Sequence, residues 1–135
     1  MIDHIGLRAR DAADVQRLKA FYVKALEPLG YTVIMEFAAE ANIGYIGVGL
    51  GVDGKPDFWI GTATGAPSDP SGHMHLAFVA KDRPTVDAFY RAAMAAGAKD
   101  NGEPGPRPHY HATYYGAFVV DPAGNNLEAV CHRPA

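Results

Sequence analysis

The chain has 135 residues, of which 48% are hydrophobic and 20% charged, and its 12 basic and 15 acidic side chains give a formal net charge of −3. This length predicts one domain, and the balanced charge argues against nucleic acid as a partner. The sequence shows neither a signal peptide nor the roughly 20 apolar residues in a row that a membrane-spanning helix needs. The single cysteine, Cys131, cannot form an internal disulfide. We therefore expect a cytoplasmic protein with no membrane partner.

The first half of the chain predicts a strand, a helix and three further strands. Residues 2–8 form a short apolar run, and the carboxylate of Asp11 can cap the helix that follows. Apolar residues recur at helical spacing from Val15 to Leu29, and Gly30 ends the pattern. The three expected strands cover residues 31–37, 43–50 and 56–61, with a turn at 52–55.

The same order returns in the second half of the chain. A strand is expected at 73–80 and a helix at 82–96, with Pro84 in the first helical turn, where a missing N–H costs little. Residues 102–109 include three prolines, so we expect this stretch to be mostly loop. The last two strands, 114–121 and 126–132, form a hairpin around a turn at 122–125. The predicted division is module one at 1–62, a polar linker at 63–72 and module two at 73–132.

The two halves also resemble each other in sequence. The octapeptide that begins at His4 and ends at Asp11 is matched by the one from His75 to Asp82, and the Phe-Tyr pair at 21–22 is matched at 89–90. Further along the chain, Trp59 aligns with Glu128. Because common solenoid repeats are shorter, with periods of about 20 to 50 residues, two long copies indicate duplicated halves of one domain.

Together these features resemble the vicinal oxygen chelate superfamily. They are the paired βαβββ modules, the histidine that opens the first strand of each, the Phe-Tyr pair in each helix, and the ending Asp121-Pro-x-Gly-Asn-x-x-Glu128. The superfamily includes glyoxalase I, extradiol dioxygenases and bleomycin-binding proteins. The resemblance implies an α+β fold in which two βαβββ modules form an open, curved eight-stranded mixed sheet, a cup with a metal in its floor.

The resemblance also implies metal ligands from the first, fourth, fifth and eighth strands. In this chain those positions hold His4, Trp59, His75 and Glu128. Because the indole nitrogen of Trp59 has no lone pair to offer, two histidines and one glutamate remain. Such a set suits divalent Fe, Zn, Mn, Ni or Co. The alternative is that the histidines are hydrogen-bonded polar residues at strand ends and that Glu128 faces solvent.

His73 is a second candidate next to His75, since both residues point to the same face of the expected strand. The repeat favours His75, because that residue aligns with His4.

Residues 107–115 combine an arginine, two histidines and three tyrosines next to a turn. We consider His109, Tyr110, His111 and Tyr115 as candidate acid or base groups. Arg107 could bind a substrate carboxylate in a bidentate contact. The alternative is that these aromatic residues pack a proline-stiffened loop against the sheet. Trp59 is expected to line the substrate pocket.

Two functions remain open at this point. The first is a metal-dependent enzyme of the glyoxalase and dioxygenase superfamily, whose small-molecule substrate chelates the metal through adjacent oxygens. The missing fourth ligand at Trp59 argues against a straightforward glyoxalase I and for dioxygenase-like or other chemistry. The alternative is a metal-free protein that binds an aromatic or cationic small molecule, as bleomycin-binding proteins do. In either case we expect a homodimer, in which the modules pair within a chain or across the twofold axis.

Overall fold

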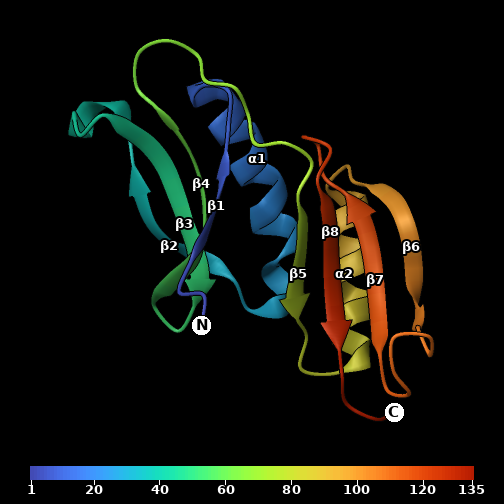
Figure 1. Cartoon of the computed structure of the whole chain (residues 1–135). Helices are drawn as coiled ribbons and strands as arrows, with labels where there is room; N and C mark the ends of the chain where they lie inside the picture. The colour runs from blue at the N-terminus through green and yellow to red at the C-terminus, as the bar shows by residue number, and fades with distance from the viewer. The chain divides into compact units, whose positions relative to one another are not determined.

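A computed structural model describes the whole chain, residues 1–135 (Figure 1). It contains eight strands, two α-helices and two short 3-10 helices. In chain order these are β1 (Ile5–Arg8), α1 (Ala12–Ala25), η1 (Glu27–Leu29), β2 (Thr32–Phe37), η2 (Ala39–Ala41), β3 (Tyr45–Val52), β4 (Lys55–Ala63), β5 (His75–Val79), α2 (Arg83–Ala95), β6 (Lys99–Pro106), β7 (Tyr115–Val120) and β8 (Asn126–Cys131).

The chain divides into two compact units. The first unit comprises Met1–Val23 and Gly30–Gly72, and the second comprises Lys24–Leu29 and His73–Ala135. Each unit contains one four-stranded mixed sheet with the same topology, β1-β4-β3-β2 in the first and β5-β8-β7-β6 in the second. In each sheet the first pair of strands is parallel and the other pairs are antiparallel. The predicted α+β fold with two βαβββ modules is therefore confirmed.

In the first unit, one face of the sheet is buried and the other carries glycines and aromatic rings. Val48, Leu50, Phe58 and Ile60 are buried, and the Phe58 ring lies 4.9 Å from that of Tyr22 in α1. Alternation along a strand places the neighbouring residues of β3 and β4 on the opposite face. That face includes Tyr45, Gly47, Gly49, Trp59 and Gly61, and we call it the open face of the first sheet.

The second sheet repeats this division into two faces. Helix α2 packs on β6, β7 and β8, and its buried residues Val86, Phe89 and Ala93 form part of the core. The alternate residues of β7 and β8 lie on the other face, which we call the open face of the second sheet. It includes Tyr114, just before β7, and Phe118, Glu128 and Val130.

Two predicted elements differ from the structure. The first helix ends at Ala25 instead of continuing to Leu29, because Pro28 lacks an N–H and disfavours helical geometry in the residue before it; a 3-10 turn follows. The prediction that 102–109 is mostly loop was wrong, since β6 runs from Lys99 to Pro106. Prolines are tolerated there because β6 is the edge strand of its sheet and its pairing with β7 contains two irregularities.

The polar segment between the modules runs from residue 64 to residue 74, slightly later than the expected 63–72, and it is bonded to the first unit. Strand β4 continues to Ala63. Beyond it, the backbone N–H groups of Ser68 and Ser71 donate to the carbonyls of Arg10 and Arg8, at 2.8 and 3.0 Å. These bonds lay the segment along the end of β1.

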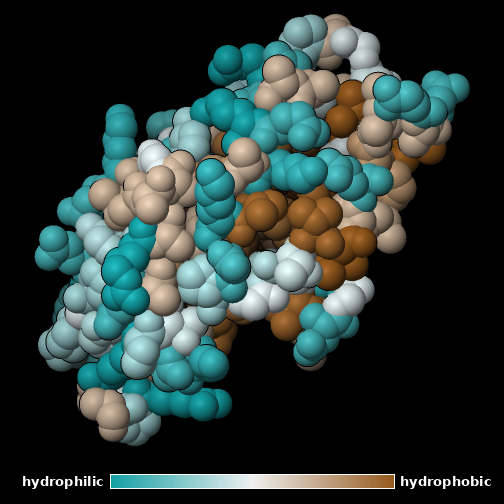
Figure 2. All heavy atoms as spheres, turned by 180° about the vertical axis from the view of Figure 1, so that it is seen from behind, coloured by the Kyte–Doolittle hydropathy of each residue, from teal (hydrophilic) through white to brown (hydrophobic).

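The surface carries some large apolar side chains, as the brown residues in Figure 2 show. Among those more than a third exposed are Val33 and Met35 of the edge strand β2, at 38% and 44%. Cys131 is buried at the end of β8. No helix is both long and apolar enough to cross a membrane.

Candidate functional site

The open face of the second sheet brings two of the predicted metal ligands together. Ala77 of β5 lies opposite Glu128 of β8 in a parallel pair, so His75, two residues earlier, points to the same face as Glu128. The Nε2 atom of His75 lies 2.8 Å from Oε2 of Glu128. The glutamate is only 1% exposed, while about half of the His75 side chain is accessible. A buried carboxylate thus meets an accessible imidazole.

The second carboxylate oxygen of Glu128 also has a partner. The hydroxyl of Tyr114 donates a hydrogen bond to Oε1. The Tyr114 ring lies over Gly116, where a Cβ atom would come within 3.2 Å of the ring and 3.3 Å of the carboxylate. Burial, this hydrogen bond and the charge of Glu128 together raise the pKa of Tyr114 well above its usual range. The phenol therefore remains protonated and acts as a donor to Glu128.

Tyr114 was not among the candidates that we took from the sequence. The repeat contains a signal that could have identified it, since Tyr45 and Tyr114 are separated by the same number of residues as Trp59 and Glu128. The pairing of Phe118 with Glu128 decides which of the two consecutive tyrosines faces the carboxylate.

The turn at 121–125 fixes the start of β5 next to β8. The Asp121 carboxylate accepts hydrogen bonds from the backbone N–H groups of Ala123 and Asn125 and from the Asn125 side chain, each at 2.8 Å. The side-chain oxygen of Asn125 in turn accepts from the backbone N–H of Met74, at 3.0 Å. Met74 directly precedes His75, so the motif residues Asp121 and Asn125 position the histidine.

His73 lies elsewhere. A Cβ atom on Gly124 would be 3.2 Å from the His73 Nε2 atom, so this imidazole rests on the turn. Of the two neighbouring histidines, His75 is the one in contact with Glu128.

The third predicted ligand, His4, belongs to the first unit and precedes β1. Its Nδ1 atom lies 2.8 Å from the Asp3 carboxylate. This hydrogen bond, together with the nearby Lys55, lowers the pKa of Asp3. Since Gly6 pairs with Trp59 as Ala77 pairs with Glu128, His4 and Trp59 occupy the same register as His75 and Glu128.

Trp59 is part of an aromatic group on the open face of the first sheet. Its indole stacks on the ring of Phe37, with centroids 6.1 Å apart and planes 10° apart. The same indole lies over Gly49, where a Cβ atom would be 2.8 Å from Cζ2. The first sheet thus has an aromatic surface at the position where the second has a carboxylate.

The candidates in the loop before β7 lie in two places. Tyr110 is 58% exposed, and its ring packs against those of His109 and Tyr114, with centroids 4.3 and 4.9 Å away. His111 Nε2 lies 2.8 Å from Nδ1 of His132, which follows β8. These contacts place the aromatic loop next to Tyr114.

Tyr115 lies on the opposite face of the second sheet. Its hydroxyl donates to Asp87 of α2 at 2.8 Å, and the Arg83 guanidinium lies 5.0 Å from its ring centre. Arg107 folds back on its own strand, donating to the carbonyl of Glu103 at 2.8 Å and lying over the Phe118 ring. Both residues therefore already have partners within the second unit.

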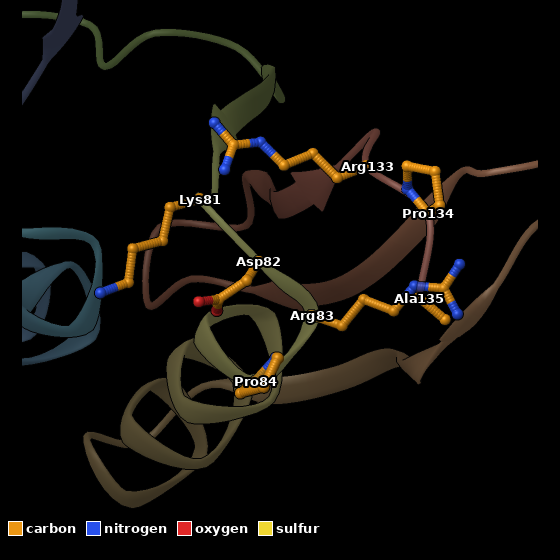
Figure 3. A pocket seen from close by; sticks show the side chains of 7 residues that line it. All are labelled: Lys81, Asp82, Arg83, Pro84, Arg133, Pro134 and Ala135. Atoms are coloured by element: carbon orange, nitrogen blue, oxygen red, sulfur yellow. The ribbon is translucent and has the colours of Figure 1, made fainter.

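A cavity of about 390 Å³ lies at the start of α2 and is lined by basic residues (Figure 3). The side chains of Lys81 and Arg83 extend to opposite sides of the helix start. Asp82, between them, caps the helix by accepting from the backbone N–H of Thr85 at 2.8 Å. The cavity therefore has no set of cations that converge on one point.

Comparison with known proteins identifies the family. The model of the Glyoxalase/Bleomycin resistance protein/Dioxygenase superfamily matches residues 1–129. The chain belongs to this superfamily. No curated protein gave a significant match in a sequence search.

Solved structures of the superfamily share the fold. A glyoxalase/bleomycin resistance protein from Albidiferax ferrireducens T118 is 25% identical, with a TM-score of 0.66 over 98% of both chains. A glyoxylase/bleomycin resistance protein/dioxygenase domain from Frankia sp. EAN1pec has a TM-score of 0.72 at 17% identity, also over 98% of both chains. Glyoxalase I from Zea mays is 20% identical with a TM-score of 0.65, and the match covers 99% of this chain but 45% of the maize chain. The last two similarities concern the fold alone.

The second unit offers two residues that fit a superfamily metal. His75 and Glu128 present a nitrogen and an oxygen donor 2.8 Å apart, a separation that a shared cation can bridge. Neither unit by itself contains a group of three or more His, Cys, Asp or Glu side chains suited to a metal. The third ligand implied by the resemblance, His4, is a residue of the first unit.

Proposed function

We propose that the protein is a metal-dependent enzyme that acts on a small molecule. In this proposal His75, Glu128 and His4 hold the metal, which is divalent Fe, Zn, Mn, Ni or Co. When bound, such a metal supplies a Lewis acid that stabilises negative charge on a substrate chelating it through two adjacent oxygens. The observation that carries the proposal is the contact between the buried Glu128 carboxylate and the accessible His75 imidazole.

The surroundings of Glu128 support its role as a ligand. Burial of a carboxylate is costly unless its oxygens have hydrogen-bond or metal partners. The Tyr114 hydroxyl engages one oxygen, and His75 lies next to the other. Hydrogen bonds of this kind orient a ligating carboxylate and tune its basicity. Tyr114 would therefore hold Glu128 in place while His75 and the glutamate share the cation.

A group that moves a proton to or from the substrate is best sought in the loop before β7. The rings of Tyr110 and His111 pack against that of Tyr114, and the His109 ring packs on Tyr110. All three of these loop residues are exposed. An imidazole can both donate and accept a proton, which suits it to this task. Tyr115 has its hydroxyl bonded to Asp87 on the helix side of the sheet, so we propose no proton transfer for it.

We further propose that the protein works as a homodimer. The apolar side chains of Val33 and Met35 on the edge strand β2 support this, since exposed apolar edges are normally covered. A second copy of the chain is the partner that we expect.

A second candidate is metal-free binding of an aromatic or cationic small molecule. It is favoured by the stacked rings of Trp59 and Phe37 on the open face of the first sheet. Aromatic faces attract both other rings and cations. Trp59 would then line the pocket for the ligand.

Metal analysis of the protein purified without chelators separates the two candidates. The enzyme proposal expects close to one divalent metal per chain, and it expects His75→Ala and Glu128→Gln to lose that metal. His73→Ala is the matched control and should keep it, because His73 rests on the turn at Gly124. A protein that neither contains nor takes up a divalent metal contradicts the enzyme proposal and leaves the binding protein. Metal loss in His73→Ala instead of His75→Ala would show that the wrong histidine was assigned.

The reaction type is then tested with the metal-loaded protein. Oxygen consumption with catechols identifies dioxygenase chemistry, and isomerisation of a thiol hemiacetal identifies glyoxalase chemistry. Because Trp59 stands where the resemblance implies a fourth ligand, we expect dioxygenase or other chemistry rather than the glyoxalase reaction.

A further inference from the structure

We propose that Asn101 is a modification site, at which the asparagine loses ammonia through a cyclic imide and becomes aspartate or its isomer isoaspartate. The chain has four asparagines, and Asn101 is the one that a glycine follows. The reaction requires the backbone nitrogen of the next residue to attack the asparagine side chain. Glycine permits this close approach because it has no Cβ atom. Water then opens the imide, and Asn101 is exposed to it.

Asn101 occupies an irregular position in the edge strand β6. Asp100 pairs with Val119 of β7, and Gly102 pairs with the preceding residue of β7, Phe118. Asn101 therefore lies between them as an extra residue without a partner. Such an extra residue interrupts the ladder of backbone hydrogen bonds. Gly102 has a φ of 144°, a conformation that other residues rarely adopt, so the backbone at this point departs from regular strand geometry.

The carboxylate of Asp100 lies next to the attacking nitrogen. The backbone N–H of Gly102 donates to its Oδ1 atom at 2.9 Å. The hydroxyl of Tyr90 in α2 donates to the same oxygen at 3.0 Å and holds the carboxylate in place. The nitrogen must lose its proton as it attacks, and a carboxylate that already accepts this N–H is in position to take the proton. Asp100 is therefore the proton acceptor of the reaction.

The side-chain amide of Asn101 is also held in place. Its Nδ2 atom donates to Oδ1 of Asn126, the first residue of β8, at 3.1 Å. This bond restricts rotation of the amide that is attacked. Because Asn101 lies at the exposed edge of the sheet, the departing ammonia passes directly into solvent.

The reaction balances in two steps. In the first, the Gly102 nitrogen gives its proton to Asp100 and forms a bond to Cγ of Asn101. The bond between Cγ and Nδ2 then breaks, and Nδ2 leaves with that proton as ammonia. In the second step one water adds to the five-membered imide. Opening between Cγ and the nitrogen gives aspartate, whereas opening between the main-chain carbonyl carbon and the nitrogen gives isoaspartate, whose backbone runs through Cβ and Cγ.

The product changes the charge and the contacts of this sheet edge. A carboxylate at position 101 directly follows that of Asp100, comes two residues before Glu103 and cannot donate to Asn126. Isoaspartate also adds one atom to the backbone, at a place where the strand is already irregular. Charged side chains on an edge strand oppose its pairing with other chains. The modification therefore makes β6 a more acidic edge that is less suited to pairing.

The test is peptide mapping by mass spectrometry on full-length protein, incubated in mildly alkaline buffer made with water enriched in heavy oxygen. We expect Asn101 to become an acid that contains one heavy oxygen, with isoaspartate among the products. Asn42, Asn125 and Asn126 are internal controls. Asn101 should react at least about tenfold faster than each of them, a difference of about 1.4 kcal/mol in activation free energy.

Two variants test the role of Asp100. Asp100→Asn keeps an oxygen that can accept the Gly102 N–H but lacks the charge that attracts a proton, so it should slow the reaction at Asn101 about fivefold or more. Glu103→Gln is the matched control, because it removes a neighbouring carboxylate to which the Gly102 N–H is not bonded, and it should leave the rate unchanged. Far-UV circular dichroism establishes that both variants are folded.

An unchanged mass at residue 101, or a rate equal to that of the other asparagines, overturns the proposal. Aspartate without isoaspartate also overturns it, because direct hydrolysis of the amide gives aspartate alone. An equal rate in Asp100→Asn and the parent protein overturns the role of Asp100. None of these measurements depends on whether His75 and Glu128 bind a metal.

Discussion

The two halves of the chain fasten their strand-opening histidines in different ways. In the second half, the residue before His75 is bonded through its backbone to Asn125, which is only 3% exposed. In the first half, the residue before His4 is bonded through its carbonyl and its carboxylate to Lys55, with both side chains more than half exposed. A buried amide in the second half and an exposed ion pair in the first half thus make corresponding connections. Both halves tie the start of their first strand to the turn before their last strand, but with groups of different burial and charge.

The open faces of the two sheets also differ in the kind of side chain that they carry. The second sheet concentrates polar groups on Glu128, whose two oxygens face Tyr114 and His75. The first sheet replaces the carboxylate by Trp59, so the equivalent tyrosine, Tyr45, has no carboxylate to bond and lies over Gly61 instead. At this position one half therefore brings a carboxylate, a phenol and an imidazole together, and the other presents aromatic rings.

The largest expected effect comes from breaking the buried connection. Asn125→Ala removes the acceptor for the Met74 N–H and the donor to Asp121, so it should lower the free energy of unfolding by about 3 kcal/mol. Lys55→Met removes only an exposed pair, and we expect no measurable change. Urea denaturation compares the two variants. Equal losses in the free energy of unfolding would show that the buried and the exposed connection stabilise the protein equally, which would contradict the expected difference between the halves.

A smaller effect is expected from filling the space under Tyr45. Gly61→Ala places a methyl group 1.9 Å from the Tyr45 hydroxyl oxygen, and it should cost about 1 kcal/mol as the ring moves aside. The equivalent position in the second half holds Val130. A side chain fits there because the Tyr114 ring lies over Gly116 instead.

A double-variant cycle checks this assignment by thermal or urea unfolding. If displacement of the Tyr45 ring causes the loss of stability, Gly61→Ala should change the free energy of unfolding little in a Tyr45→Ala background. Costs that simply add would mean that another contact is responsible.

The smallest effect concerns alkaline pH. Burial, the hydrogen bond to Glu128 and the charge of Glu128 raise the pKa of Tyr114 in the native state, whereas burial alone raises that of Tyr45. Tyrosine in the unfolded chain ionises near its usual pKa of about 10, so the unfolded state loses its proton first. Stability contributed by Tyr114 is therefore full below about pH 10 and falls as the pH rises further.

Urea denaturation at pH 8, 9 and 10.5 measures this slope. Tyr114→Phe should flatten it more than Tyr45→Phe does, because only Tyr114 has a carboxylate partner. An equal change in both variants would contradict the difference between the halves.

The sequence predicted most of the fold because each half contains the same periodic pattern. The helix cap predicted at Asp11 is present, with its carboxylate accepting from the backbone N–H of Asp14 at 2.8 Å. Asp82 caps the second helix in the same way, accepting from the backbone N–H of Thr85 at 2.8 Å. The predicted turn at 52–55 is present, and its central residues Asp53 and Gly54 both have positive φ, as tight hairpin turns favour. Strand β6 was missed because composition alone does not reveal that its prolines lie on a sheet edge.

The candidate site could be predicted less completely. Spacing within the repeat pointed to His75 and Glu128, which the structure brings into contact. We did not single out Tyr114, although the repeat pairs it with Tyr45. Adjacent tyrosines point to opposite faces, and the pairing of β7 with β8 shows that Tyr114 is the one that faces Glu128.

Trp59 has one further consequence, which is optical. It is the chain's single tryptophan and lies in the first unit, stacked on Phe37. Its emission therefore reports the first half alone, while far-UV circular dichroism reports both. Unfolding curves from the two signals will coincide if the halves melt together and separate if they do not. The single tryptophan therefore makes the unfolding of the two halves distinguishable by spectroscopy.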